Sequence, residues 1–236
     1  MNLLRPILIA FALSLAAIAP ATAQDLQRGL EAAQRGDFAT ALREWRPLAE
    51  QGDAKAQHNL GLMYSNGDGV PNDHAEAVLW FRLAAEQGFA PAQFSLGVMF
   101  DTARGAAKDD VEAVHWWRLA AVQGHASAQY NLGNMFEEGR GVPQDNSKAV
   151  HWFRLAAKQG RLLVAMTNLG LMYAEGKGVS KDLIRAYMWS SLAADQGDQG
   201  ALENREMIAK LMTAEQIAEA QQLTRDCVAR HLMLCW

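Results

Sequence analysis

Cysteine is scarce in this chain, and its position limits what it can do. The 236 residues contain two cysteines, Cys227 and Cys235, both near the C-terminal end. In a continuous helix their Cα atoms would lie about 12 Å apart, beyond the roughly 7 Å that a disulfide can span. A disulfide therefore requires the helix to end between them, and the alternative is two buried or free thiols.

An excess of positive charge is also absent. The chain carries 22 basic and 26 acidic side chains, a formal net charge of −4. This balance gives no electrostatic basis for binding nucleic acid or anionic lipid. Hydrophobic residues make up 50% of the sequence, which is enough for a substantial core and argues against disorder.

The apolar run near the N-terminus is too short to cross a membrane. It covers residues 6–19, whereas a spanning helix needs about 20 apolar residues. Arg5 precedes the run, and small residues, Ala21 and Ala23, stand at the positions that signal peptidase reads. The pattern predicts a signal peptide over residues 1–23, cleaved after Ala23, and a soluble protein secreted to the periplasm. An uncleaved membrane anchor is the alternative.

What the chain does contain is a fourfold internal repeat. Residues 56–64 read A-Q-H-N-L-G-L-M-Y, and related segments return at 92–100, 128–136 and 165–173. Residues 77–88 return in step at 113–124, 149–160 and 186–197. Apolar residues fall at helical spacing in both segments, so each unit is predicted to be a pair of helices.

The segment between the two predicted helices carries turn residues. In the first unit it reads G-D-G-V-P-N-D over residues 67–73. The glycines permit positive φ, Pro71 ends the first helix, and Asp73 is placed to cap the second. In the second unit Ala103 and Ala106 replace the loop glycine and the valine, so we expect a locally different loop there.

A glycine recurs inside the first helix of every unit, at Gly61, Gly97, Gly133 and Gly170. Such a glycine costs about 1 kcal/mol relative to alanine, so its recurrence predicts that a neighbouring helix approaches closely. The pair Ala84 and Ala85 of the second helix would be the complementary surface. The second helices share a tryptophan column that is predicted to lie in the core: Trp80, Trp116, Trp152 and Trp189.

These motifs resemble the Sel-one-like repeat family, a branch of the tetratricopeptide superfamily. The family pattern is A-x-x-x-L-G-x-x-Y-x-x-G-x-G-V-x-x-D, followed by A-x-x-W-x-x-x-A-A-x-x-G. It fits four units, at residues 54–89, 90–125, 126–161 and 162–198. The resemblance implies an all-α fold, a right-handed α-solenoid of stacked antiparallel helix pairs, and a role in assembling or regulating protein complexes.

Shorter segments flank the four repeats. Residues 24–53 are predicted to form an N-terminal helix pair, because Ala41 and Trp45 echo the second helix of a unit. Residues 199–236 are predicted to form capping helices, since a solenoid leaves an apolar face open at each end. Thr213 followed by Gln216 is the signature of a capping box there.

The sequence contains no recognisable catalytic or metal-binding arrangement. No serine has a lysine three residues later, as S-x-x-K hydrolases require, and no H-x-x-x-H pair exists. Some exported proteins of the family that the chain resembles bind or hydrolyse β-lactams, but they carry a cysteine pair in each repeat, which this chain lacks. We expect no enzymatic activity, cofactor or metal; a β-lactam-binding protein or another hydrolase on the same scaffold is the alternative.

The candidate binding residues lie on the first helices, which line the concave face in tetratricopeptide-like folds. An amide or hydroxyl recurs beside the core leucine, at Asn59, Ser95, Asn131 and Asn168. Amides in a row can hydrogen-bond the backbone of an extended peptide; the alternative is that they hold neighbouring units or loops together. The preceding column is too mixed for a core and is predicted to face solvent or a ligand: His58, Phe94, Tyr130 and Thr167. We expect a monomer that binds a protein or peptide through these columns.

Arginine and aspartate form two further columns. The arginines are Arg46, Arg82, Arg118 and Arg154, and the aspartates are Asp73, Asp109, Asp145 and Asp182. We expect them to form ion pairs at the surface or in the loops, each contributing little to stability.

The predicted cleavage can be tested on the exported protein. Intact-mass measurement should give a chain that begins at Gln24, because the residues at 21 and 23 fit the signal peptidase site. A variant with Ala21→Leu and Ala23→Leu should keep its leader. A wild-type mass that still includes residues 1–23 would contradict the prediction.

Overall fold

The computed structural model describes residues 18–159 and 162–230, and the elements in these ranges are all α-helices. Their bounds are α1 Ile18–Gln34, α2 Phe38–Glu50, α3 Ala54–Asn66, α4 His74–Glu86, α5 Ala90–Asp101, α6 Asp110–Val122, α7 Ala126–Glu138, α8 Asn146–Ala157, α9 Leu163–Glu175, α10 Leu183–Ala194, α11 Gln199–Ala209 and α12 Ala214–Ala229. Most of the predicted signal peptide, residues 1–17, lies outside the described residues. The helix α1 runs through the predicted cleavage point after Ala23.

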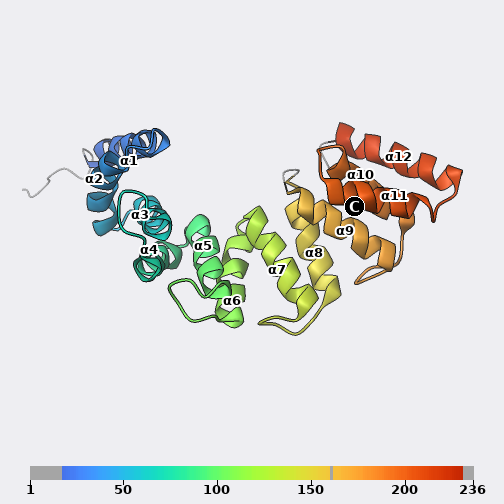
Figure 1. Cartoon of the computed structure of the whole chain (residues 1–236), viewed down its shortest axis with the longest axis horizontal. Coiled ribbons are helices and arrows are strands. Elements are labelled where there is room, and N and C mark those ends of the chain that lie inside the picture. The colour runs from blue at the N-terminus through green and yellow to red at the C-terminus, as the bar shows by residue number, and fades with distance from the viewer. Residues whose placement is uncertain (1–17, 160–161, 231–236) are drawn as a thin grey trace, which may run out of the picture.

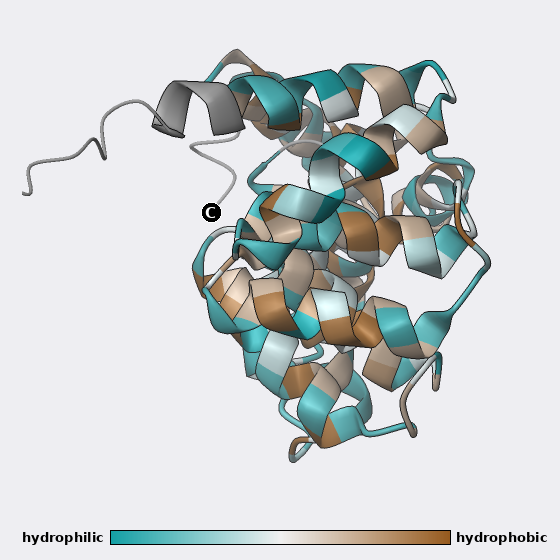
Figure 2. Cartoon of the chain, turned by 90° about the vertical axis from the view of Figure 1, so that its left-hand side faces the viewer, coloured by the Kyte–Doolittle hydropathy of each residue, from teal (hydrophilic) through white to brown (hydrophobic). Residues whose placement is uncertain are grey.

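The helices pack as pairs that follow one another along an arch (Figure 1). Each of the helices α1, α3, α5, α7 and α9 packs against the helix that follows it, and each pair packs against the next. The last two helices, α11 and α12, pack on α10. Hydrophobic and hydrophilic residues alternate along the helices (Figure 2), as expected where one side of each helix is buried. The all-α solenoid predicted from the sequence is confirmed.

An aromatic ring of the second helix lies against the glycine of the first helix in the first three units. We express each contact as the distance from an ideal Cβ, placed on the glycine, to the nearest ring carbon. These distances are 2.5 Å from Gly61 to Phe81, 2.6 Å from Gly97 to Trp117 and 2.5 Å from Gly133 to Phe153. The ring therefore occupies the space that a methyl group would need. The predicted close approach is right, but its partner is a ring rather than Ala84 and Ala85.

The N-terminal pair repeats this contact, and the fourth unit modifies it. In the pair α1 and α2, Trp45 lies against Gly29 and donates from Nε1 to the Leu26 carbonyl at 3.1 Å. In the fourth unit, the side chain facing Gly170 is the buried Ser190, whose Oγ is 2.6 Å from the corresponding Cβ position. The N-terminal pair is thus built like a repeat with a shorter loop.

The tryptophan column lies beside this contact rather than in it. Trp116 and Trp189 are buried as predicted, but Trp80 and Trp152 are only half-buried. In the first three units it is the following residue, Phe81, Trp117 or Phe153, that lies against the glycine. The prediction of a uniform core tryptophan column is therefore wrong.

The loops between the paired helices share a residue in the left-handed region at one position. Gly67 ends α3 in the left-handed region with φ 81°, and Ala103 takes the same region at the equivalent position with φ 55°. The second loop differs locally in that α5 ends one residue earlier, with Thr102 as its C-cap, while Ala103 adopts a conformation that favours glycine. At the far end of the first loop, Asp73 caps α4 as predicted, accepting hydrogen bonds from the backbone N–H groups of Ala75 and Glu76.

Buried glutamines link neighbouring units, which the sequence did not predict. Gln57 of α3 donates from Nε2 to the carbonyl of Ala49 in α2 at 3.0 Å and accepts at Oε1 from Gln87 at 2.7 Å. The same two bonds recur at the next two junctions, around Gln93 and Gln129. At the junction of α8 and α9 the equivalent residue is Met166, which is buried.

The glycine contact predicts the effect of a single methyl group. Gly133→Ala should lower the free energy of unfolding by about 1–3 kcal/mol, because the new Cβ overlaps the Phe153 ring. Gly200→Ala in α11 is a matched control, since the only neighbour within 4 Å of its Cβ position is Asp198 Oδ1 at 3.5 Å. That variant should gain about 0.5–1 kcal/mol. Urea denaturation of both variants measures the difference, and equal stabilities would refute the steric role.

Candidate functional site

One side of the first helices carries the predicted polar column, and we call it the first-helix face. It contains Asn59 on α3, Ser95 on α5, Asn131 on α7 and Asn168 on α9, all half-buried. Ser95 Oγ lies 3.3 Å from His58 Nε2. Within the described part of the chain, the three asparagine side chains form no hydrogen bond. They therefore do not tie units together, and their amides remain available to a ligand, although their role in binding stays a prediction.

A small recess surrounds Asn131 at the junction of α5 and α7. It measures about 100 Å³, and its lining includes Asp101, Asn134 and Arg140. Arg140 Nη2 donates to the carboxylate of Asp101 and to Oδ1 of Asp110 at 2.7 Å. The hydrogen bond from Arg140 lowers the pKa of Asp110 and raises the pKa of the arginine. The amide of Asn131 thus lies beside a fixed ion pair.

A second recess repeats this arrangement one unit later, around Asn168. It measures about 190 Å³ and is also lined by Glu137, Leu171, Glu175 and Lys177. Lys177 Nζ donates to Glu137 Oε1 at 2.7 Å, and this bond raises the pKa of the lysine. In both recesses a loop cation pairs with an acid on the first helix of the preceding unit. The repeat pattern does not single out these cations, although both stand between the two loop glycines.

The column that precedes the asparagines is half-buried, so it is only partly exposed, and its role in binding stays a prediction. The ring contacts, given as centroid distances, are His58 to Phe81 at 5.6 Å, His58 to Phe89 at 5.5 Å, Phe94 to His125 at 4.6 Å and Tyr130 to Phe153 at 5.6 Å. Phe89 and His125 are the N-cap residues of α5 and α7. The start of the next unit therefore covers His58 and Phe94, whereas Tyr130 packs on the second helix of its own unit.

Three of the four arginines in the arginine column contact aromatic side chains rather than aspartates. The four aspartates cap the second helices. Arg46 donates to the Tyr64 hydroxyl at 3.0 Å, and Arg82 Cζ lies 5.7 Å from the centroid of the Phe100 ring. Arg154 combines both contacts on Tyr173. The expected ion pairs between these two columns are not present among the described residues.

The C-terminal helix contains one of the two cysteines. Cys227 is buried and disulfide-bonded, while Cys235 lies outside the described residues, so the pairing itself stays a prediction. The capping box of Thr213 and Gln216 is confirmed at the start of α12. Among the residues described, no three His, Cys, Asp or Glu side chains are placed to hold a metal ion. None of the described helices is long and apolar enough to span a membrane.

The half-buried His58 should make the stability of the protein depend on pH. Burial lowers the pKa of His58 from 6.5 to about 4, and His125 adds repulsion. The folded state disfavours the protonated imidazole of His58. The free energy of unfolding is therefore highest above pH 6.5, and it falls by up to about 3 kcal/mol as the pH drops toward 4. His58→Gln should therefore flatten the fall in unfolding free energy over this range, measured by urea denaturation. The exposed His115→Gln is the control; an unchanged slope for His58→Gln would contradict the prediction.

Comparison with known proteins places this geometry in a family. The model of the Sel1 repeat matches residues 54–89, 90–125, 126–160 and 163–198. No protein with a curated description matches the chain.

Solved structures share the fold. A protective antigen present in uropathogenic Escherichia coli strains, which displays an SLR fold, is 32% identical with a TM-score of 0.82; the match covers 91% of this chain and 47% of the antigen. The chain thus spans about half of that protein's length. A Sel1 repeat protein from Oxalobacter formigenes is 34% identical with a TM-score of 0.69, covering 84% of this chain and 74% of that one. With four matched units and these two relatives, the chain belongs to the Sel1 repeat family.

Proposed function

We propose that this protein is an exported scaffold that binds an extended segment of a partner protein along the first-helix face. Proteins of the Sel1 repeat family are generally scaffolds for protein interaction. The observation that carries the proposal is the pair of unbonded amides, Asn131 and Asn168, each in a recess at a junction of units. An amide side chain offers both a donor and an acceptor, which matches the N–H and C=O groups of an extended backbone.

The charges around the two recesses favour a partner segment with basic side chains. The first recess contains Asp101, Glu138 and Arg140, and the second contains Glu137, Glu175 and Lys177. Each therefore has one carboxylate more than it has cations. A lysine or arginine of the partner would meet this surplus while the asparagines hold its backbone.

Export to an oxidising compartment is part of the same proposal. Arg5, the apolar residues 6–19 and the small residues before Gln24 favour a cleaved leader. The disulfide-bonded Cys227 is typical of proteins that work in the periplasm or outside the cell. No observation on the described residues favours the β-lactam-binding or hydrolase alternative, and we do not propose it.

Site-specific crosslinking tests where the partner binds. A photoreactive residue at Asn134 or Leu171, on the first-helix face, should crosslink a protein in the periplasm that mass spectrometry identifies. The same residue at Leu79, which is 57% exposed on α4, is the control and should give no such product. Equal capture from position 79 would contradict binding on the first-helix face.

The identified partner then permits a quantitative test. Asn131→Ala combined with Asn168→Ala should weaken binding by about 30-fold or more, since each lost hydrogen bond contributes about 1 kcal/mol. The melting temperature should stay close to that of the wild type, because neither amide bonds within the described chain. Asn204→Ala on α11 is the control. A double variant that binds like the wild type would overturn the role of the amides.

A further inference from the structure

The tryptophans Trp80 and Trp116 of the first two units are each anchored by a glutamate one turn earlier on the same helix. Trp80 Nε1 donates to Glu76 Oε1 at 3.0 Å, and Trp116 Nε1 donates to Glu112 Oε2 at 3.0 Å. Both glutamates lie in the first turn of their helices, where a negative charge is favourable. The indole N–H groups of these two units are therefore satisfied within the protein.

In the third unit a lysine takes the place of the glutamate. Lys148 pairs through Nζ with Asp145 Oδ2 at 3.0 Å and lies 5.4 Å from the centroid of the Phe136 ring. As a cation, it offers no acceptor to Trp152. Within the described residues, the indole N–H of Trp152 has no hydrogen-bond acceptor.

The same lysine also displaces an arginine. Phe136 occupies the position that Phe100 and Tyr173 occupy in neighbouring units. There, the arginine of the preceding second helix lies over the ring, Arg82 over Phe100 and Arg154 over Tyr173. Because Lys148 occupies the ring, Arg118 is left exposed. It makes no ion pair or hydrogen bond to another described residue.

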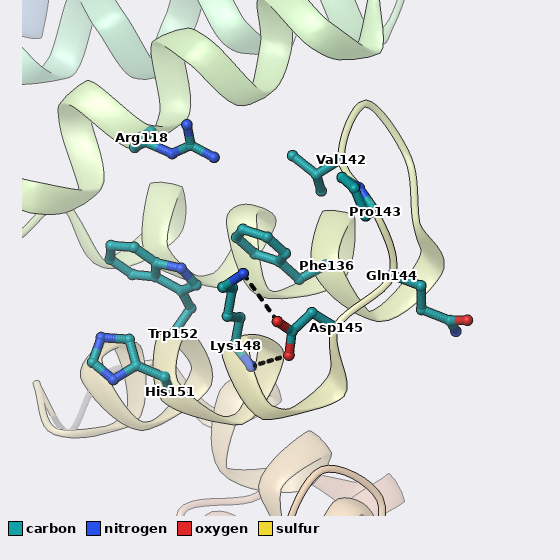
Figure 3. A pocket seen from close by; sticks show the side chains of 9 residues that line it. All are labelled: Arg118, Phe136, Val142, Pro143, Gln144, Asp145, Lys148, His151 and Trp152. Carbon is teal, nitrogen blue, oxygen red and sulfur yellow. Dashed lines mark hydrogen bonds and ion pairs between the residues drawn. The ribbon is translucent and has the colours of Figure 1, made fainter.

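These unsatisfied donors surround one recess between α6 and α8 (Figure 3). It measures about 520 Å³, within the range of small-ligand sites. Arg118 lies across it from Trp152 and Lys148, and Val142 and Pro143 of the loop form an apolar wall. The one carboxylate in the lining is Asp145, which is engaged by the backbone N–H and Nζ of Lys148. Gln144 points away from the recess (Figure 3).

We propose that this recess binds a carboxylate attached to an apolar or aromatic body. The planar guanidinium of Arg118 suits a carboxylate, which it can hold through two parallel hydrogen bonds. The indole N–H of Trp152 adds a third donor, and because Lys148 neutralises Asp145 the recess keeps the positive charge of Arg118. The ring of Trp152, with Val142 and Pro143, packs against the rest of the ligand. This site is separate from the first-helix face, so either proposal can fail alone.

The indole resonance of Trp152 reports on this site. In a ¹H–¹⁵N spectrum of the full chain, assigned with Trp152→Phe, N-acetylphenylalanine should shift this resonance in a saturable manner. The uncharged amide of the same compound should leave it in place. No saturable shift with the acid, or the same shift with the amide, would overturn the proposal.

The chain itself supplies the decisive variant. Lys148→Glu recreates the pairs seen at Trp80 and Trp116, so it should satisfy the indole N–H and weaken the binding of N-acetylphenylalanine at least tenfold. Arg118→Gln should weaken it similarly, because the guanidinium that holds the carboxylate is lost. Lys181→Glu, the same change of charge at an exposed loop position, should bind like the wild type. Circular dichroism melts confirm that each variant is folded, and wild-type affinity in folded Lys148→Glu and Arg118→Gln would refute the site.

Two peptides distinguish the sources of the carboxylate. One ends in phenylalanine with a free C-terminus, and the other has an amidated C-terminus and an internal glutamate beside phenylalanine. A shift with the first alone assigns the recess to chain termini, and a shift with the second assigns it to acidic side chains. The absence of a shift with both, while N-acetylphenylalanine binds, assigns it to small carboxylic acids.

Discussion

The contact between a helix glycine and a ring of the next helix is the constraint on which this solenoid depends. In three units the ring stands where a Cβ would be, so the two helices of a pair lie closer than alanine would allow. Dense packing makes such a contact intolerant of added volume. The N-terminal pair, outside the four matched repeats, uses the same device with Gly29 and Trp45. The contact thus defines the structural unit more widely than the repeat pattern does.

Glutamine bridges join one close pair to the next. Gln57, Gln93 and Gln129 each reach a backbone carbonyl near the end of the preceding second helix, and this carbonyl also accepts from the N–H of the glycine that follows the helix. Because each bridge also accepts a bond from a second glutamine, its polar atoms are satisfied despite burial. The orientation between units is therefore set by directional bonds as well as by apolar contact.

Periodicity in the sequence predicts the helices, their pairing and their caps, because these depend on local residue types. It fails where the partner of a residue comes from another unit. Phe94 is partly covered by the N-cap residue His125, and Arg118 lacks a ring contact because Lys148 occupies the Phe136 ring. The loop at Ala103 is a different case. The surrounding chain holds this alanine in a left-handed backbone conformation, which composition alone would not assign. For the asparagines, the sequence gives their position, but only the structure shows that their amides are unbonded.

The buried methionine at the last repeat junction has a mechanical consequence. Met166 stands where the earlier junctions have a glutamine, so α8 and α9 meet there without the bridge to a backbone carbonyl. Apolar contacts resist separation but are non-directional, and they permit sliding and rotation that a hydrogen bond opposes. When the arch is stretched or bent, we expect the first change in orientation between α8 and α9, with the segment from α9 to α12 moving as a rigid body.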